Sequence, residues 1–222
     1  MVITTEIHRR EFLAACTALA ASVAAGRIAR AGVGLAARAA GRPDSREVRS
    51  ILGSLVRTIL PFEHPRFPPV SPETIEARLL AMFPVDTDAR LLPLQQALQL
   101  FNELDLFPQL APALEALERD ALDADPATPA GIVEAALAQR AAADRRSYQA
   151  FRDSIQPPGA GRFTELTPAA RSAYLRLWGR SGFTVKRRFY RSAKGLVTVT
   201  AYSMEQLWRA IAYAGPLLER RP

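Results

Sequence analysis

Few side chains in this sequence could carry out chemistry beyond simple acid–base contacts. The 222 residues contain two histidines, His8 and His64, and a single cysteine, Cys16. A transition-metal site normally needs several His or Cys ligands at short spacing, and a nucleophilic Ser or Cys needs a histidine close to it. His64 has only Glu63 beside it, in a segment flanked by prolines. The sequence therefore favours a polar loop residue over a metal ligand at His64.

Other chemical motifs are missing or lie in the wrong context. The sequence has no Cys-x-x-Cys-His haem attachment motif and no Gly-rich phosphate loop, and no pair of carboxylates stands out from solvated helix faces. Residues 32–37 (Gly-Val-Gly-Leu-Ala-Ala) match the spacing of a dinucleotide-binding turn, but Ala and Arg precede them instead of a strand. A linker is the better interpretation. We expect no cofactor and no metal in this chain, and a non-catalytic role.

The N-terminal segment has the residue order of a bacterial export signal. Arg9 and Arg10 form a positive head, Phe12 and Leu13 follow, and an alanine-rich stretch comes next. A positive head, a weakly apolar body and small residues at the end are typical of a signal peptide. The order Arg-Arg-x-Phe-Leu resembles the twin-arginine signal, with His8 where Ser or Thr is usual. The resemblance implies export of the folded protein to the periplasm by the twin-arginine translocase.

Other interpretations of this segment stay open. An amphipathic helix at the start of a cytoplasmic protein has a similar composition, and residues 13–16 (Leu-Ala-Ala-Cys) have the form of a lipoprotein cleavage box. The lipoprotein interpretation is weak because only residues 11–15 separate this cysteine from the arginines, too few for an apolar core. A membrane span is disfavoured because Arg27 and Arg30 interrupt the apolar stretch before the roughly 20 residues that a span needs.

Apolar periodicity beyond the signal predicts an all-α fold. Apolar residues recur at helical spacing from a cap at Asp44 or Ser45 to Ile59, and Pro61 ends this helix. Three later helices should start with a hydroxyl cap followed by proline, at Ser71-Pro72, Thr128-Pro129 and Thr167-Pro168. We expect an irregular bundle of about seven helices with Pro-rich connecting loops. Residues 1–40 would be signal and linker, and residues 41–222 a single helical domain.

The remaining helical segments are predicted from their apolar residues and end signals. One helix is expected over residues 91–106, and a short or bent one over residues 110–122. The long helix from Thr128 to about Ile155 has a polar middle, residues 139–146, that we expect to be solvated and lightly anchored. Residues 183–202 contain the strand-type run Val-Thr-Val-Thr but no alternation, so a helix is favoured. A final helix should run from Ser203 to Gly215.

Charge is distributed unevenly along the chain. Residues 41–161 hold 12 basic and 17 acidic side chains, whereas residues 162–222 hold 12 basic and 3 acidic ones. A basic C-terminal region next to an acidic one indicates either an acidic partner surface or nucleic acid. The export signal and the acidic preceding region argue against nucleic acid. A nucleic-acid-binding protein and a stand-alone periplasmic enzyme that works through carboxylates remain the alternatives.

The basic C-terminal region also contains most of the large aromatic residues. Aromatic and Arg side chains are the common anchors of protein interfaces. The residues that we expect at a partner interface are Trp178, Arg180, Lys186, Arg187, Arg188, Tyr190, Trp208 and Tyr213. The alternatives are that Trp178 and Trp208 belong to the core, and that the run from Lys186 to Arg188 is a solvated helix face.

The same region resembles a segment found with flavin-dependent glucose-methanol-choline oxidoreductases. The residues that carry the resemblance are Phe163, Leu166, Arg171, Leu175, Leu177, Trp178, Ser181, Arg188, Tyr202, Trp208 and the stretch Ile211-Ala212-Tyr213-Ala214-Gly215-Pro216. With the twin-arginine signal and the Ile59-Leu60-Pro61 loop, the layout resembles the gluconate 2-dehydrogenase subunit 3 family. The sequence departs from the family's Gly-Tyr-x-Gly element, which reads Ala212-Tyr213-Ala214-Gly215 here.

The resemblance implies a specific division of labour between two subunits. The small subunit carries the export signal, and the large subunit binds FAD in the cytoplasm and crosses the membrane bound to the small one. Electrons then pass from the flavin to a separate acceptor such as a cytochrome c subunit, through which the complex can associate with the membrane. The resemblance places no catalytic residue on this chain, because the redox chemistry belongs to the large subunit.

Overall fold

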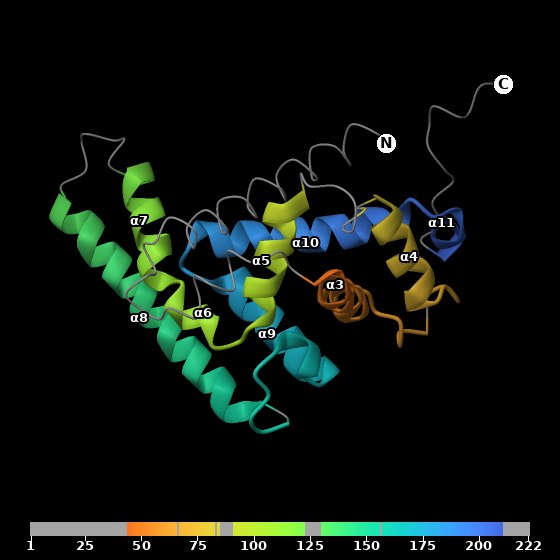
Figure 1. The fold of residues 1–222 in the computed structure, drawn as a ribbon, viewed down its shortest axis with the longest axis horizontal. Helices are drawn as coiled ribbons and strands as arrows, with labels where there is room; N and C mark the ends of the chain where they lie inside the picture. The colour runs from red at the N-terminus through yellow and green to blue at the C-terminus, as the bar shows by residue number, and fades with distance from the viewer. Residues whose placement is uncertain are drawn as a thin grey trace.

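The computed structural model describes residues 44–65, 67–82, 84, 91–122, 130–155 and 157–210. Figure 1 shows their helices, which are α3 (Ser45–Ile59), α4 (Pro72–Met82), α5 (Leu92–Asn102), α6 (Leu106–Gln109), α7 (Ala111–Leu122), α8 (Ala130–Ser154), the 3-10 turn η2 (Phe163–Glu165), α9 (Pro168–Arg180), α10 (Thr184–Tyr202) and α11 (Glu205–Ala210). These ranges contain no β-strand. The predicted all-α bundle is confirmed, including a helical α10.

Local capping signals set most of the helix starts. The Asp44 carboxylate accepts a hydrogen bond from the Arg46 amide (2.9 Å), and the Thr167 hydroxyl accepts one from the Ala170 amide (3.4 Å). The Ser71 hydroxyl likewise accepts a bond from the first turn of α4. Side-chain oxygens at these positions satisfy amides that have no partner within the helix. The predicted starts of α3, α4 and α9 are confirmed, whereas Thr128-Pro129 lies outside the described residues.

The prediction of a single helix over residues 91–106 is wrong. Helix α5 ends at Asn102, and Glu103 is extended and forms an isolated antiparallel bridge with Arg162. The Leu104 amide donates to the carbonyl of Gly161 (2.9 Å) instead of continuing the helix. A backbone segment distant in sequence therefore competes with the helical hydrogen bonds and divides this stretch into α5 and α6.

The middle of α8 is also anchored more firmly than its polar sequence indicates. Ala141 and Asp144 are buried, and Arg140 forms an ion pair with Glu118 of α7. The expectation of a solvated middle over residues 139–146 is therefore wrong for the side of α8 that faces the bundle. The physical reason is that ion pairs and small side chains, rather than large apolar ones, hold this side.

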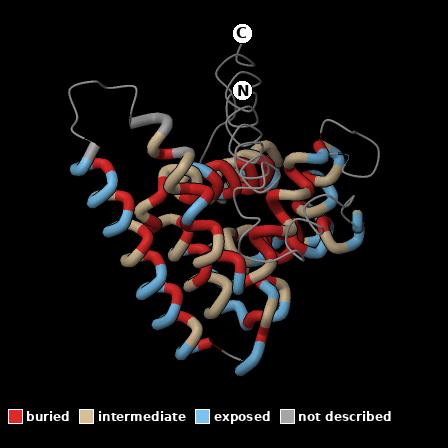
Figure 2. The backbone as a smooth tube through the Cα atoms, turned by 60° about the vertical axis from the view of Figure 1, so that its left-hand side comes forward, coloured by how far each residue is buried: buried red, intermediate tan, exposed pale blue. Residues whose placement is uncertain are grey.

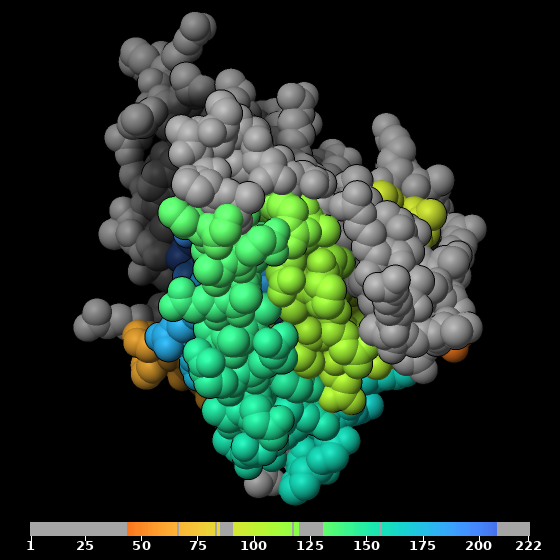
Figure 3. Space-filling view, turned by 90° about the vertical axis from the view of Figure 1, so that its left-hand side faces the viewer, coloured from red at the N-terminus to blue at the C-terminus, as the bar shows by residue number. Residues whose placement is uncertain are grey.

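The bundle is arranged around α3 and α10. Helix α3 packs against α4, α5, α9 and α10, and α10 also contacts α4, α9 and α11. Helices α7 and α8 form a pair at one end, as Figure 1 shows, and their surfaces lie side by side in Figure 3. Both helices pack against α6, and α8 also packs against α9. Figure 2 shows buried residues toward the middle of the bundle and exposed residues on its outer sides. One cluster of buried apolar side chains includes residues from α3, α5, α8, α9 and α10.

An aromatic cluster lies at the centre of this core. The Phe101 ring of α5 has four aromatic neighbours, with ring centroids 4.7 Å (Phe163), 5.3 Å (Tyr174), 5.2 Å (Trp178) and 5.1 Å (Phe189) away. These partners come from η2, α9 and α10. Tilted and edge-on pairs of this kind are the favoured arrangements of aromatic rings. The cluster joins α5 to three consecutive elements that lie much later in the sequence.

The structure describes only part of the expected final helix. The last described helix, α11, begins at Glu205, after the predicted cap at Ser203, and residues 211–215 of the expected final helix lie outside the described residues. Among the helices that the structure describes, none is both long enough and apolar enough to span a membrane.

Candidate functional site

A buried ion pair lies where α8, α9 and α10 meet. The Lys186 ammonium of α10 donates to an oxygen of the Asp144 carboxylate of α8 at 2.8 Å. The Lys186 side chain is 0% exposed and that of Asp144 is 5% exposed. Lysine and aspartate are almost never this deeply buried unless they are paired. Its deep burial therefore distinguishes this pair as the centre of the candidate site.

The surroundings of Lys186 act on its pKa in opposite directions. Its ammonium donates to the Phe107 carbonyl (2.8 Å) and lies 3.5 Å from the centre of the Phe107 ring. Burial disfavours the charged amine and lowers the pKa of Lys186 to about 8, although the Asp144 carboxylate raises it. The amine is therefore charged at neutral pH, and it begins to lose its proton in mildly alkaline solution.

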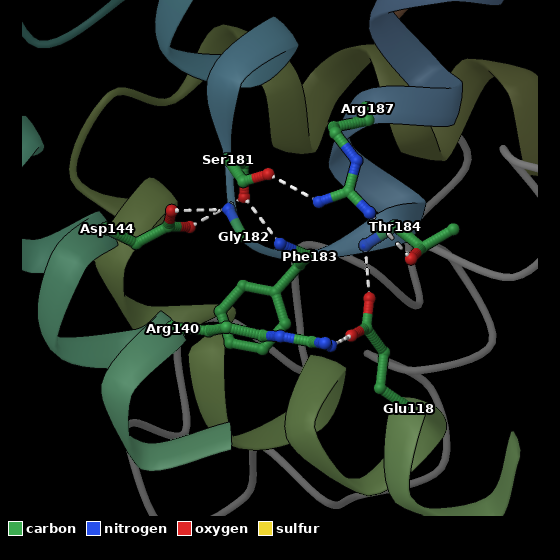
Figure 4. A network of polar contacts seen from close by, with 8 residues as sticks. All are labelled: Glu118, Arg140, Asp144, Ser181, Gly182, Phe183, Thr184 and Arg187. Carbon is green, nitrogen blue, oxygen red and sulfur yellow. Dashed lines mark hydrogen bonds and ion pairs between the residues drawn. The ribbon is translucent and has the colours of Figure 1, made fainter. Parts of the chain in front are cut away.

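Asp144 also organises the turn between α9 and α10, which Figure 4 shows from close by. Its two oxygens accept hydrogen bonds from the Ser181 hydroxyl (2.8 Å) and the Gly182 amide (3.2 Å). The Ser181 hydroxyl in turn accepts a bond from the Phe183 amide (3.0 Å). One carboxylate thus fixes the backbone where one helix stops and the next begins.

A second acidic residue fixes the start of α10 from the other side. The Glu118 carboxylate of α7 accepts hydrogen bonds from the Thr184 amide and from the Arg140 guanidinium (Figure 4). A carboxylate at a helix N-terminus accepts from amides that have no partner within the helix and complements the helix dipole. Arg187 completes the turn by donating to the Ser181 carbonyl (2.6 Å). This network joins α7, α8, α9 and α10.

A groove opens to solvent above the buried pair. It has a volume of about 330 Å³, and its floor contains Phe107, Asp144 and Ser181. Three small, exposed residues line it from α8, namely Ser147, Ala150 and Ser154. Because these side chains are short, α8 and α9 do not fill the space between them. We call this feature the α8–α9 groove.

Helix α9 gives the groove a basic rim. Arg176 and Arg180, one turn apart and both exposed, line it together with the apolar side chains of Ala173 and Leu177. Neither guanidinium forms an ion pair with any residue that the structure describes. Helix α9 itself contains no acidic residue. The groove therefore offers a mixed apolar and cationic surface to solvent.

The chemistry of this arrangement is structural and electrostatic. Lys186, Asp144, Ser181 and Glu118 all have hydrogen-bond partners that belong to the turn or to neighbouring helices. Within the described ranges, no group of three or more His, Cys, Asp or Glu side chains is placed to hold a metal ion. His64 lies in the exposed loop between α3 and α4. The site can hold helices together and attract an anionic group to its rim.

The predicted interface residues differ in how far the structure exposes them. Trp178 and Lys186 are both buried, so neither side chain is part of the accessible surface, and Trp178 belongs to the core as its alternative interpretation states. Arg188 is exposed, whereas Arg187 and Tyr190 are partly buried. Among the members of the set whose side chains the structure describes, only Arg180 lines the groove.

The other predicted site residues lie at or beyond the ends of the described chain. Trp208 belongs to α11, but its side chain lies outside the described part of the structure, as does Tyr213. The signal residues Arg9, Arg10, Phe12 and Leu13 also lie outside it.

Sequence reasoning missed Asp144 as a site residue, although the sequence contains a signal for it. Asp144 continues the buried positions of α8, which are Val133, Leu137, Ala141, Tyr148 and Phe151. Lys186 in the same way precedes Phe189, Ala193 and Leu196 on the buried side of α10. An acid on one apolar stripe and a base on another are the pattern of a buried ion pair.

The fold and the site define an all-α protein with a buried Lys–Asp pair beneath a basic groove. No protein-family model, no curated protein and no solved structure matches the chain.

Proposed function

We propose that this chain is the small, non-catalytic subunit of an exported oxidoreductase complex. In this proposal it binds a folded FAD-containing dehydrogenase and takes it across the cytoplasmic membrane by the twin-arginine route. The single observation that carries the proposal is the Arg9-Arg10-x-Phe12-Leu13 head on a chain with a basic, aromatic-rich C-terminal region. The FAD, the substrate site and the transfer of electrons to a cytochrome c belong to the partners.

Two properties of the structure support a binding role. The buried charged groups around the α9–α10 turn hold helices together, which suits a scaffold. The exposed groove and its two arginines, which form no ion pair with a described residue, offer a surface for a second protein. In this proposal the helical domain binds the flavoprotein through such a surface while the signal directs both proteins to export.

Localisation in the producing bacterium tests the proposal. The partner to follow is a large FAD-dependent oxidoreductase without its own signal, encoded by an adjacent gene. We expect this flavoprotein to co-purify with the chain and to reach the periplasm only when the chain is present. The double variant Arg9→Lys/Arg10→Lys should retain both proteins in the cytoplasm. Normal export of the flavoprotein in that variant, or in a strain that lacks the chain, would count against the proposal.

A second candidate function is binding of a polyanion such as nucleic acid. The observation that favours it is the exposed row Arg188, Arg191 and Lys194 on α10, a helix that contains no acidic residue. Phosphate contacts of this kind give binding that weakens steeply with salt. A mobility-shift titration with duplex and single-stranded DNA at two salt concentrations tests it, and no shift at low salt removes this candidate.

A further inference from the structure

We infer that the α8–α9 groove receives an acidic, partly apolar segment of the large flavoprotein subunit. This inference rests on the proposed function and deepens it, because it locates the contact between the two subunits. It moves the interface from the predicted aromatic and basic set to a groove that shares Arg180 with the described members of that set.

The shape of the groove fits a protein segment. Ser147, Ala150 and Ser154 are separated by about one turn each, so they form a shallow track along α8. Leu177 of α9 and the buried Phe151 of α8 also line the groove. An amphipathic segment that lies in a groove between helices makes contacts of this kind. The volume of about 330 Å³ accommodates side chains of such a segment rather than a large cofactor.

The charge of the groove selects an acidic occupant. Arg176 and Arg180 are exposed and have no ion-pair partner among the described residues, and the floor carboxylate of Asp144 is already paired with Lys186. The groove therefore has a net positive charge. An unpaired Arg presents a planar fork of donors that matches a carboxylate. Two such forks, one helical turn apart on the same rim, fit carboxylates that are also about one turn apart.

The exposed surface of α10 provides a matched control. Arg188 and Arg191 are also exposed and are also without an ion-pair partner within the described chain, but no residue of α10 lines the groove. Reversing two charges there changes the net charge by the same amount as reversing them on the rim. The comparison separates local recognition in the groove from general attraction between a basic and an acidic protein.

The experiment is co-purification of the full chain with the FAD-dependent subunit encoded by the adjacent gene. We expect Arg176→Glu/Arg180→Glu to lower the amount of bound flavoprotein by about tenfold or more. The two glutamates introduced on the rim would repel the acidic segment of the flavoprotein. Arg188→Glu/Arg191→Glu should lower it much less. Thermal unfolding followed by circular dichroism checks that both variants fold, since all four arginines are exposed.

A pair of tryptophan substitutions tests the shape of the groove separately from its charge. Ala150 lines the groove and Ala138 does not, but both are exposed on α8. Ala150→Trp should fill the groove and lower flavoprotein binding by about tenfold, as expected when a central contact is lost. Ala138→Trp should leave it close to that of the wild type.

Each outcome has a distinct meaning. If the wild-type chain binds no flavoprotein, the proposed function fails and this inference fails with it. If the wild type binds and the rim and Ala150→Trp variants bind equally well, the groove is not the contact and only the inference fails. Loss of binding in Arg188→Glu/Arg191→Glu alone would place the contact on α10 and overturn the inference as well.

Discussion

Lys186 and Asp144 join α10 to α8 through a 2.8 Å ion pair that is almost completely shielded from solvent. The same carboxylate holds Ser181 and Gly182, so the pair lies at the centre of the contacts between α8 and the α9–α10 turn. A charge that loses its partner in such a place has no water to replace it. The pair should therefore be sensitive to changes on either side.

We expect Lys186→Met to lower the free energy of unfolding by about 3–5 kcal/mol, the range found when one partner of a buried pair is removed. Urea unfolding followed by circular dichroism measures the change. Glu134→Gln is a matched control, because Glu134 also forms an ion pair, with Arg119, but at an exposed position. That variant should unfold close to the wild type. Similar losses in both variants would show that burial does not set the strength of the Lys186 pair.

The pKa of Lys186 predicts a pH dependence of stability. Its pKa is about 8 in the folded chain, because of burial, and near 10.5 in the unfolded chain. Between these values the unfolded chain binds more protons at this residue, so its contribution to the free energy of unfolding rises with pH and is lost as pH falls toward 8. The slope is at most about 1.4 kcal/mol per pH unit.

The measurement compares the wild type with Lys186→Met from pH 7.5 to pH 9.5. The free energy of unfolding of the wild type should rise relative to that of the variant over this range. Burial raises the pKa of Tyr148 and Tyr174 above their ordinary value of 10, so both tyrosines stay protonated in the folded chain at these pH values. A difference that stays flat or falls between pH 8 and 9.5 would contradict the lowered pKa.

Helix starts could be predicted from the sequence, but one break could not. Asp44 and Thr167 act on amides within the next few residues, so their effect is visible locally. The break after Asn102 depends on hydrogen bonds from Leu104 to Gly161, a residue far along the chain. Local propensity contains no information about such a partner.

The candidate site could be predicted only in part, for a geometric reason. Successive residues of a helix point about 100° apart, so the three cations from Lys186 to Arg188 face different directions. The structure buries the first, leaves the second partly buried and exposes the third. Composition indicated a basic region correctly, but only the register with Phe189 and Ala193 on the buried side shows which cation points inward.

Gly182 lies close to Arg140 of α8, and this predicts a steric effect. A Cβ atom on Gly182 would lie 2.8 Å from the Cβ of Arg140 and 3.3 Å from its Cα. The backbone must shift to relieve such contacts, so we expect Gly182→Ala to lower the free energy of unfolding by about 1–3 kcal/mol. The shift would also disturb the hydrogen bond from the Gly182 amide to Asp144.

Gly131→Ala is the matched control for this substitution. Gly131 is exposed in α8, and a Cβ there meets nothing within 4 Å. Replacing a helical glycine by alanine without a clash raises stability by about 0.4–1 kcal/mol. The thermal unfolding midpoint should therefore fall in Gly182→Ala and rise in Gly131→Ala, relative to the wild type. A stabilising effect of Gly182→Ala would mean that the turn has more room than the structure shows.

Phe101 joins α5 to the aromatic cluster, since its ring contacts partners from η2, α9 and α10. Phe101→Ala removes a completely buried ring and should lower the free energy of unfolding by about 3–5 kcal/mol. The control is Phe62→Ala, because Phe62 is only partly buried in the loop after α3 and has one aromatic neighbour, Phe67, among the described rings. Phe62→Ala should lower the free energy of unfolding clearly less than Phe101→Ala does in the same urea titration. If both variants lose equal stability, the Phe101 ring is not what holds α5 to α9 and α10, and other contacts must do so.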